Sequence, residues 1–170
     1  MTETGVSNRS GYAQFYSDGA MANKEWGGGI LSPDVNNIAL ESQKSAKPIK
    51  LVRLSQFLLE TVGRRKLPPS PKGEGPPRVL MKMDIEGSEI DVLPDILFNG
   101  GLSVVNGLMI EFHERLEKLP KRKEAHKKLN DILNQLSSVS KNLPSSGYDF
   151  SIVNLDDETY GTSDEPLPKC

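Results

Sequence analysis

The hydrophobic and polar pattern of the N-terminal third predicts short strands separated by turns. The first residues are typical of the end of a strand, and Asn8-Arg9-Ser10-Gly11 predicts a turn. Tyr12–Tyr16 alternates and is aromatic, so it predicts a strand. The stretch 17–37 is rich in Gly, Asn, Ser and Asp and predicts a loop, with a short strand at Ile30–Leu31.

The middle of the chain predicts one more strand, one helix and a long loop. Apolar residues within 49–52 indicate the strand, and Ser55 is expected to cap the helix that follows. The apolar face of that helix is expected to hold Leu58, Leu59 and Val62. Residues 67–77 contain five prolines and two glycines, which are incompatible with a helix or a central strand and predict a surface loop.

Beyond this loop the pattern becomes regular. Val79–Met83 is a short, mostly apolar run that predicts a buried parallel strand. A helix is expected from about Ser88, and Pro94 is expected to interrupt it or to begin a second turn. Gly100-Gly101 closes this helix, and Val104–His113 predicts the next strand.

The last part of the chain predicts a long amphipathic helix over residues 121–136 and a strand over Tyr148–Leu155. Apolar residues at three- and four-residue steps form its inner face, namely Ala125, Leu129, Ile132, Leu133 and Leu136. Its basic residues are expected to face solvent: Lys121, Arg122, Lys123, Lys127 and Lys128. Strands that alternate with helices predict an α/β fold with a largely parallel sheet.

Length and charge narrow the class of protein. With 170 residues the chain is long enough for one domain, expected over residues 1–160 with a flexible tail at 161–170. The formal net charge of −2 argues against a dedicated nucleic-acid binder, which carries a clear basic excess. The one cysteine, Cys170, excludes an internal disulfide. No signal peptide follows Met1 and no apolar run is long enough to span a membrane, and no compartment is predicted.

Candidate chemistry lies just past two of the predicted strands. Ligands of open parallel sheets bind outside the carboxyl ends of the strands. Asp84 and Glu86 follow one strand, while Glu111 and His113 alternate onto one face at the end of the next. If these strands are neighbours, the four side chains line one crevice. Such a group suits proton abstraction, metal binding or both, and neighbouring carboxylates raise one another's pKa.

Simpler interpretations compete with this one. Acidic residues just before a helix often only cap it, and a single histidine at a strand end is often a solvated surface residue. The conjunction of two polar pairs at two successive strand ends favours a functional site. The spacing alone does not select a metal site over a general base, and the sequence by itself assigns no metal ligands.

Two motifs resemble the FkbM family of S-adenosylmethionine-dependent methyltransferases. That family carries Lys-x-Asp-Val/Ile-Glu-Gly-Ala/Ser-Glu at the end of a strand, which resembles Lys82–Glu89 here, and then Val-Leu in the next helix, as in Val92-Leu93. Its next strand typically ends Ile-Glu-x-His, similar to Ile110–His113. Segments similar to further family motifs lie at Gly5–Tyr16 and Leu54–Leu58, so the resemblance covers about residues 5–155.

The resemblance implies a partial class I methyltransferase fold, a Rossmann-like three-layer sandwich whose mostly parallel sheet lacks its first two strands. It implies S-adenosylmethionine as cofactor and an oxygen of a small molecule or glycan as methyl acceptor. Asp84 and Glu86 would face the methyl donor and the acceptor. Val6, Ser7 and Lys82 would join Asp84 on the cofactor side, and His113 or a nearby carboxylate such as Glu111 would be the base.

One departure from the family pattern limits the resemblance. The glycine-rich turn after the family's first strand, and the acidic residue that holds the ribose, have no counterpart in the 170 residues. The sequence therefore predicts an N-terminally truncated O-methyltransferase domain, whose exposed sheet edge a partner chain would cover. The alternatives are a non-catalytic binding or interaction module, and a metal site formed by Glu111 and His113 with Asp84.

Overall fold

A computed structural model describes residues 4–17, 28–31, 47–66, 77–114, 117–142 and 149–155. The strands are β1 (Thr4–Ser7), β2 (Gly11–Ser17), β3 (Gly28–Gly29), β4 (Lys47–Arg53), β5 (Leu80–Met83), β6 (Gly107–Glu111) and β7 (Ser151–Leu155). The helices are α1 (Leu54–Phe57), which continues as the π-helix η2 (Leu58–Val62), α2 (Glu89–Phe98), the 3₁₀ helix η3 (Gly101–Val104) and α3 (Pro120–Asn142). Most of the predicted loop 67–77 and the predicted tail 161–170 lie outside the described residues.

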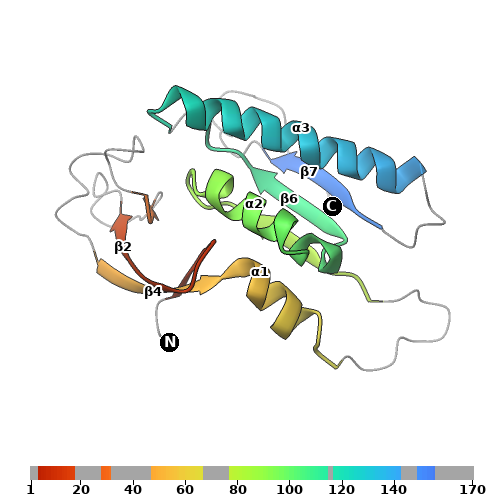
Figure 1. Ribbon diagram of the computed structural model, residues 1–170, viewed down its shortest axis with the longest axis horizontal. Coiled ribbons are helices and arrows are strands. Elements are labelled where there is room, and N and C mark those ends of the chain that lie inside the picture. The colour runs from red at the N-terminus through yellow and green to blue at the C-terminus, as the bar shows by residue number, and fades with distance from the viewer. Residues whose placement is uncertain are drawn as a thin grey trace, which may run out of the picture.

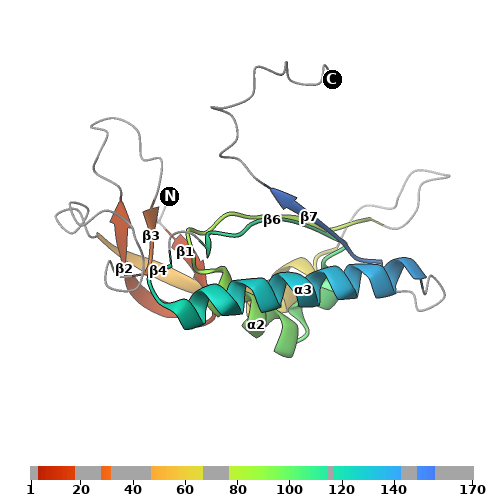
Figure 2. The ribbon, with the colours of Figure 1, turned by 90° about the horizontal axis from the view of Figure 1, so that it is seen from above.

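Three strands form a wholly parallel sheet in the order β5-β6-β7. Met83 lies beside Ile110, so β5 and β6 reach their carboxyl ends together, as the crevice prediction required. Helices α2 and α3 cover one face of this sheet, as Figures 1 and 2 show. The prediction of an α/β fold with a parallel sheet is confirmed.

The N-terminal strands form a second sheet instead of extending the first. Its order is β1-β4-β2-β3, with β1 parallel to β4 and β2 antiparallel to β4. The expected short strand at Ile30–Leu31 is wrong by two residues, because the strand that pairs with β2 is Gly28–Gly29. The described strands therefore belong to two sheets, and the single sheet implied by the resemblance is not seen among them.

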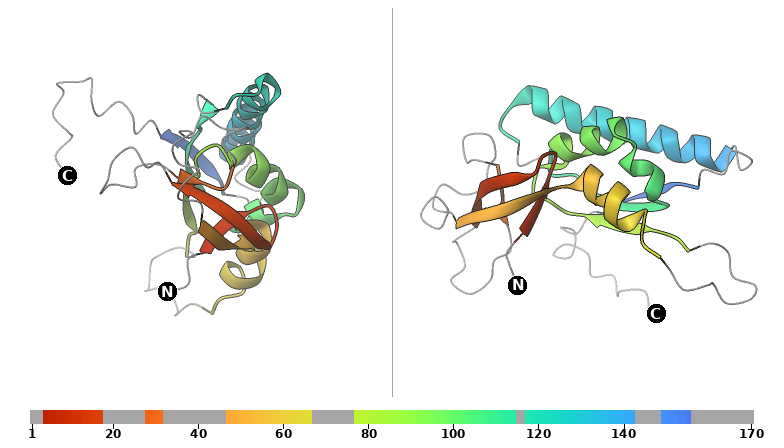
Figure 3. Two further views of the ribbon diagram at one scale, coloured as in Figure 1. Left: turned by 90° about the vertical axis from the view of Figure 1, so that its left-hand side faces the viewer. Right: turned by 60° about the horizontal axis from the view of Figure 1, so that its bottom comes forward.

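The opposite face of the parallel sheet is uncovered by the described helices, all of which lie on one side (Figure 3). Leu80, Lys82 and Val153 are exposed on that face, and Met109 is 36% exposed between the strands of Lys82 and Val153. A three-layer sandwich is thus not seen within the described part of the chain, which has two layers. No helix in that part is both long enough and apolar enough to cross a bilayer.

The core lies between the parallel sheet and its helices. Its fully buried members come from each layer: Leu93 and Ile96 from α2, Leu108 and Ile110 from β6, and Leu133 from α3. Helix α2 runs unbroken through Pro94, so the predicted interruption there is wrong. Proline removes one backbone hydrogen bond, but burial of the neighbouring apolar side chains outweighs this local cost.

The longest helix also departs from its predicted faces. It extends to Asn142, six residues beyond the predicted end at 136. Leu129 and Leu133 are buried as predicted, but Ile132 is 44% exposed. Arg122, predicted to face solvent, is largely buried, with a side chain only 18% exposed. The 3.6-residue period identifies the apolar stripe, whereas ion-pair partners on other elements decide where its margin lies.

Two further local predictions are corrected. The strand expected over Val104–His113 is shorter, because η3 occupies its first residue and β6 begins at Gly107. Ser55 does not cap the helix, since the N-cap position is Arg53. The Ser55 hydroxyl instead donates to Asp95 of α2, which also accepts from the guanidinium of Arg53. This contact ties the end of β4 to α2 and so joins the two sheets.

Candidate functional site

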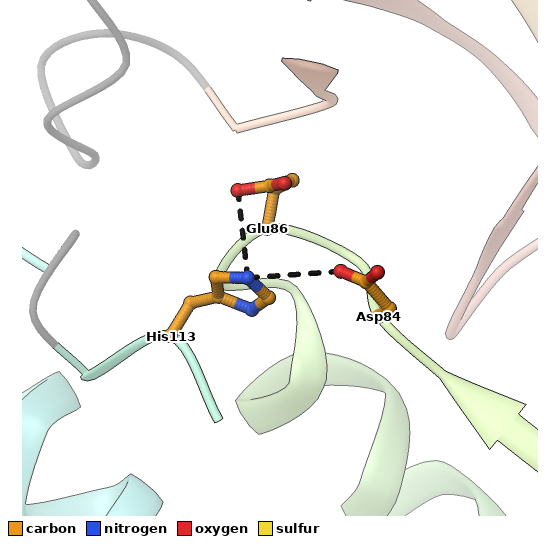
Figure 4. A group of neighbouring side chains, drawn as sticks. All are labelled: Asp84, Glu86 and His113. Carbon is orange, nitrogen blue, oxygen red and sulfur yellow. Dashed lines mark ion pairs between the residues drawn. The ribbon is translucent and has the colours of Figure 1, made fainter. Parts of the chain in front are cut away.

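A group of acidic side chains surrounds one histidine where β5 and β6 end (Figure 4). Nε2 of His113 lies 3.7 Å from Oδ1 of Asp84, 3.6 Å from Oε2 of Glu86 and 3.4 Å from Oε1 of Glu111. His113 is only 2% exposed, whereas Asp84 is exposed and Glu86 is partly buried. The structure therefore brings together all four residues that the sequence predicted as catalytic.

The turn between β5 and α2 has an unusual backbone that positions Glu86. Glu86 has φ +53° and Gly87 has φ +90°, so two successive residues are left-handed. Glycine adopts this region without strain, but a residue with a Cβ atom pays a cost of about 1–2 kcal/mol. Glu86 therefore lies in a costly conformation that points its carboxylate toward His113, and such strain is concentrated at functional sites.

A further carboxylate, Glu89, orients the histidine by contacting the other ring nitrogen, Nδ1. It is fully buried at the start of α2, and its Oε1 lies 3.0 Å from Nδ1 of His113. The same oxygen accepts the backbone N–H groups of Ile85 and Gly87, each at 3.3 Å. This contact places Nδ1 of His113 against Glu89 and leaves Nε2 facing the other acids.

The charges of this group shift two pKa values. Burial raises the pKa of Glu86, and although His113 opposes the shift, the neighbouring acids Asp84, Glu89 and Glu111 add to it. Burial disfavours the charged form of His113, but its contacts with Glu89, Glu86 and Glu111 outweigh burial and raise its pKa. The expectation that clustered carboxylates raise one another's pKa is confirmed for Glu86.

A second buried network continues behind the first. His126 of α3 is 1% exposed, and its Nε2 lies 3.3 Å from Oε1 of the fully buried Glu117. Arg122 donates to Oε2 of Glu117 at 2.6 Å and to Oδ2 of Asp91 at 2.9 Å. Nδ1 of His126 lies 4.0 Å from Oε2 of Glu89, so this network adjoins the oriented histidine.

Sequence reasoning missed Glu89, Glu117 and His126 as members of this region. Glu89 carries a usable signal, because a glutamate in the first turn of a helix can reach the N–H groups of the preceding turn. Glu117 and His126 carry no such signal in the sequence, because the network they form comes beside Glu89 only where α3 packs on α2. The N-cap residue of α2 is Ser88, whose side chain makes no capping bond.

The residues predicted to lie on the cofactor side separate into two places. Lys82 is exposed on β5, with Nζ 3.6 Å from Oδ2 of Asp84, and so borders the acidic group. Val6 is 38% exposed on β1, and Ser7 is buried at its end. Ser7 lines a cavity of about 350 Å³ whose other polar residues are Asn8, Arg9, Ser88, Asp91 and Arg122.

That cavity has features of a binding pocket, although none of the four predicted catalytic residues lines it. Ser88 Oγ is buried and has no hydrogen-bond partner among the described residues. Leu51 and Val92 contribute apolar walls. The predicted cofactor role of Val6 and Ser7 stays a prediction, because no contact among the described residues places either one beside the acidic group.

The arrangement at the ends of β5 and β6 supports two kinds of chemistry. An oriented imidazole beside carboxylates accepts a proton from a bound hydroxyl group. The same nitrogen and carboxylate oxygens are ligands for a divalent cation, and one atom each from Asp84, Glu86 and His113 lie within 4.8 Å of one another. No known protein family, curated protein or solved structure significantly matches the chain.

Proposed function

We propose that the chain forms the acceptor side of an S-adenosylmethionine-dependent O-methyltransferase, acting on a hydroxyl group of a small molecule or glycan. The observation that carries the proposal is the convergence of Asp84, Glu86 and Glu111 on Nε2 of His113. The convergence occurs at the carboxyl ends of two adjacent parallel strands, where ligands of such sheets bind. The same residues carry the resemblance to the FkbM family.

The proposed role of these side chains is to prepare the acceptor oxygen. S-adenosylmethionine, when bound, supplies the methyl group to be transferred. The hydroxyl proton passes to His113 or to a carboxylate beside it, while Glu89 holds the imidazole ring in one orientation. Asp84 is exposed and therefore reachable by a bound acceptor, which it would help to align.

The resemblance to the family supports the proposal only on this side of the site. The chain contains no glycine-rich turn after a first strand and no following acidic residue of the kind with which the family holds the ribose. A non-catalytic binding module on the same framework is therefore the second candidate, favoured by the cavity beside Ser7 and Ser88. This module would bind a ligand without transferring a methyl group.

Calorimetric titration with S-adenosylmethionine up to millimolar concentration tests the cofactor part of the proposal. Saturable heat with the unaltered chain supports it, and heat that is unchanged in Asp84→Asn would contradict the placement of Asp84 at the cofactor. Asp131→Asn is the matched control, because Asp131 is an exposed aspartate of α3 away from the acidic group. No heat at all would reject the methyltransferase function for these 170 residues and favour the binding module.

A further inference from the structure

Four carboxylates gather around the single imidazole ring of His113. Asp84, Glu86 and Glu111 all approach Nε2 of His113, and Glu89 approaches its Nδ1. Nζ of Lys82 lies 3.6 Å from Oδ2 of Asp84 on the exposed side of the group. Carboxylate oxygens and an imidazole nitrogen are ligands for a divalent cation, and one such atom each from Asp84, Glu86 and His113 lie within 4.8 Å of one another.

We propose that Asp84, Glu86 and His113 bind a divalent cation, and that Glu89 is the residue that positions the imidazole for it. This proposal is independent of methyl transfer. It differs from a chance gathering of surface acids in one respect. The His113 side chain that supplies the nitrogen ligand is only 2% exposed, and Glu89, which is not itself a ligand, holds Nδ1 so that Nε2 faces the group.

The distances between the ligand atoms fit a cation of this size. Metal–nitrogen and metal–oxygen bonds of about 2.1 Å at tetrahedral angles place two ligand atoms about 3.4 Å apart. Nε2 of His113 lies 3.6 Å from Oε2 of Glu86 and 3.7 Å from Oδ1 of Asp84. All three ligand atoms lie within 4.8 Å of one another, so rotations of the Asp84 and Glu86 carboxylates toward a bound ion would bring them to this spacing.

The second ring nitrogen supplies an independent argument. A histidine that binds a metal donates its other N–H to a carboxylate or a carbonyl, which selects the tautomer and the direction of the ring. Here Nδ1 of His113 lies 3.0 Å from Oε1 of Glu89, which is fully buried and anchored by two backbone N–H groups. Nε2 is thereby left as the position that faces Asp84 and Glu86.

The ligand set indicates the class of cation. One imidazole suits Zn²⁺ or another first-row transition ion, while two carboxylates suit harder ions such as Mn²⁺. Zn²⁺ and Mn²⁺ satisfy both preferences, and Mg²⁺, which prefers oxygen and water, should bind more weakly. With the ion on Nε2, the proton acceptor in the proposed transfer would be Glu111, the remaining carboxylate at this end of β6.

The test is calorimetric titration of the chelator-stripped chain with Zn²⁺ and, separately, Mn²⁺. One saturable site is expected, and Asp84→Asn and Glu86→Gln should each weaken it at least tenfold. Glu89→Gln, which leaves every ligand in place, should weaken it by about tenfold to a hundredfold. Asp131→Asn is the control for loss of one acidic charge and should change nothing. Circular dichroism of each variant checks that the fold is retained.

The chain contains two histidines, which gives a second measurement. Zn²⁺ should shift the imidazole Nε2 resonance of His113 strongly and that of His126 much less. Equal binding by the unaltered chain and by both ligand variants would overturn the proposal, as would a Zn²⁺ shift confined to His126. Binding lost in the control as well as in the ligand variants would show only general attraction to an acidic protein and would reject the site.

Discussion

Oε1 of Glu89 lies 3.0 Å from Nδ1 of His113, and both side chains are buried where α2 begins beneath the ends of β5 and β6. Because Glu89 also accepts two backbone N–H groups, its position is set by the turn before the helix and not by the histidine. The direction of the imidazole is therefore determined by the backbone of that turn. Nε2 of His113 is therefore held in place before any ligand binds to the group of acids.

Replacing Glu89 by Gln should lower the pKa of His113. The amide keeps the size of the side chain and one acceptor oxygen, but it removes a negative charge that now stabilises the imidazolium. Proton NMR titration of the histidine ring in the presence of a chelator measures the effect. The titration midpoint of His113 should move to lower pH, because the imidazolium loses the negative charge of Glu89 that stabilises it.

Glu60→Gln is the matched control for that titration, since Glu60 is an exposed glutamate in η2. The His113 titration should be unchanged in this control. A Glu89→Gln variant that titrates like the unaltered chain would show that the contact with Glu89 does not govern the histidine, and the positioning role would have to be abandoned.

The acidic group was predictable because it follows from a local rule. Asp84 and Glu86 come directly after one strand, and Glu111 and His113 come at the end of the next, so adjacency of two parallel strands suffices to bring them together. Glu117 and His126 are different. Glu117 lies just before α3 and His126 lies on it, and His126 comes beside Glu89 only because α3 packs beside α2, a contact that no periodicity in the sequence encodes.

The two central residues of α3 provide a direct test of which side of the helix is buried. Leu133 has no exposed surface, whereas its neighbour Ile132 is 44% exposed. Leu133→Ala should lower the free energy of unfolding by about 2–5 kcal/mol, through lost burial and the cavity left behind. Ile132→Ala should cost well under half as much. Urea unfolding of both variants measures the difference, and equal losses would contradict the observed orientation.

The two sheets were not predictable from the same patterns. The alternation of β2 and β4 says nothing about which other strand each will join, and β3 is only Gly28–Gly29, which has no side-chain pattern at all. Pro94 is a similar case, because the local cost of proline in a helix is outweighed by burial of Leu93 and Ile96 on the side facing the sheet. Propensity describes the isolated segment, whereas the partner surfaces exist only in the folded chain.

The contact between Arg53 and Asp95 should make stability depend on pH in the acid range. Hydrogen bonds from the Arg53 guanidinium hold the pKa of Asp95 below its usual value, although partial burial opposes the shift. The contribution of Asp95 to the free energy of unfolding is thus complete above its unfolded pKa of about 3.9. It is lost as the pH falls through the lower pKa that Asp95 has in the folded chain. Asp95→Asn should lose about 1–2 kcal/mol at neutral pH and little near pH 2.

Thermal unfolding of the unaltered chain and of Asp95→Asn across this pH range measures how the difference in stability between them shrinks as the pH falls. Asp131→Asn serves again as the control, because Asp131 is exposed and its loss should leave the pH profile unchanged. A constant difference between the chain and Asp95→Asn at every pH would mean that the loss comes from packing and not from the charge of Asp95.

Arg122 is the basic residue of α3 that the helical period assigned to the solvent-facing side, whereas in the structure it is largely buried. Its guanidinium joins Glu117, which is fully buried, to Asp91 of α2. Arg122→Gln removes the partner of a buried carboxylate and should cost about 3 kcal/mol, since an unpaired buried charge is strongly unfavourable. Lys123→Gln, one residue along on the exposed face, should cost almost nothing. Because Glu117 also lies beside His126, the Arg122 variant should in addition alter the ring resonances of His126, and a loss of stability without that change would assign the cost to lost packing of the arginine stem alone.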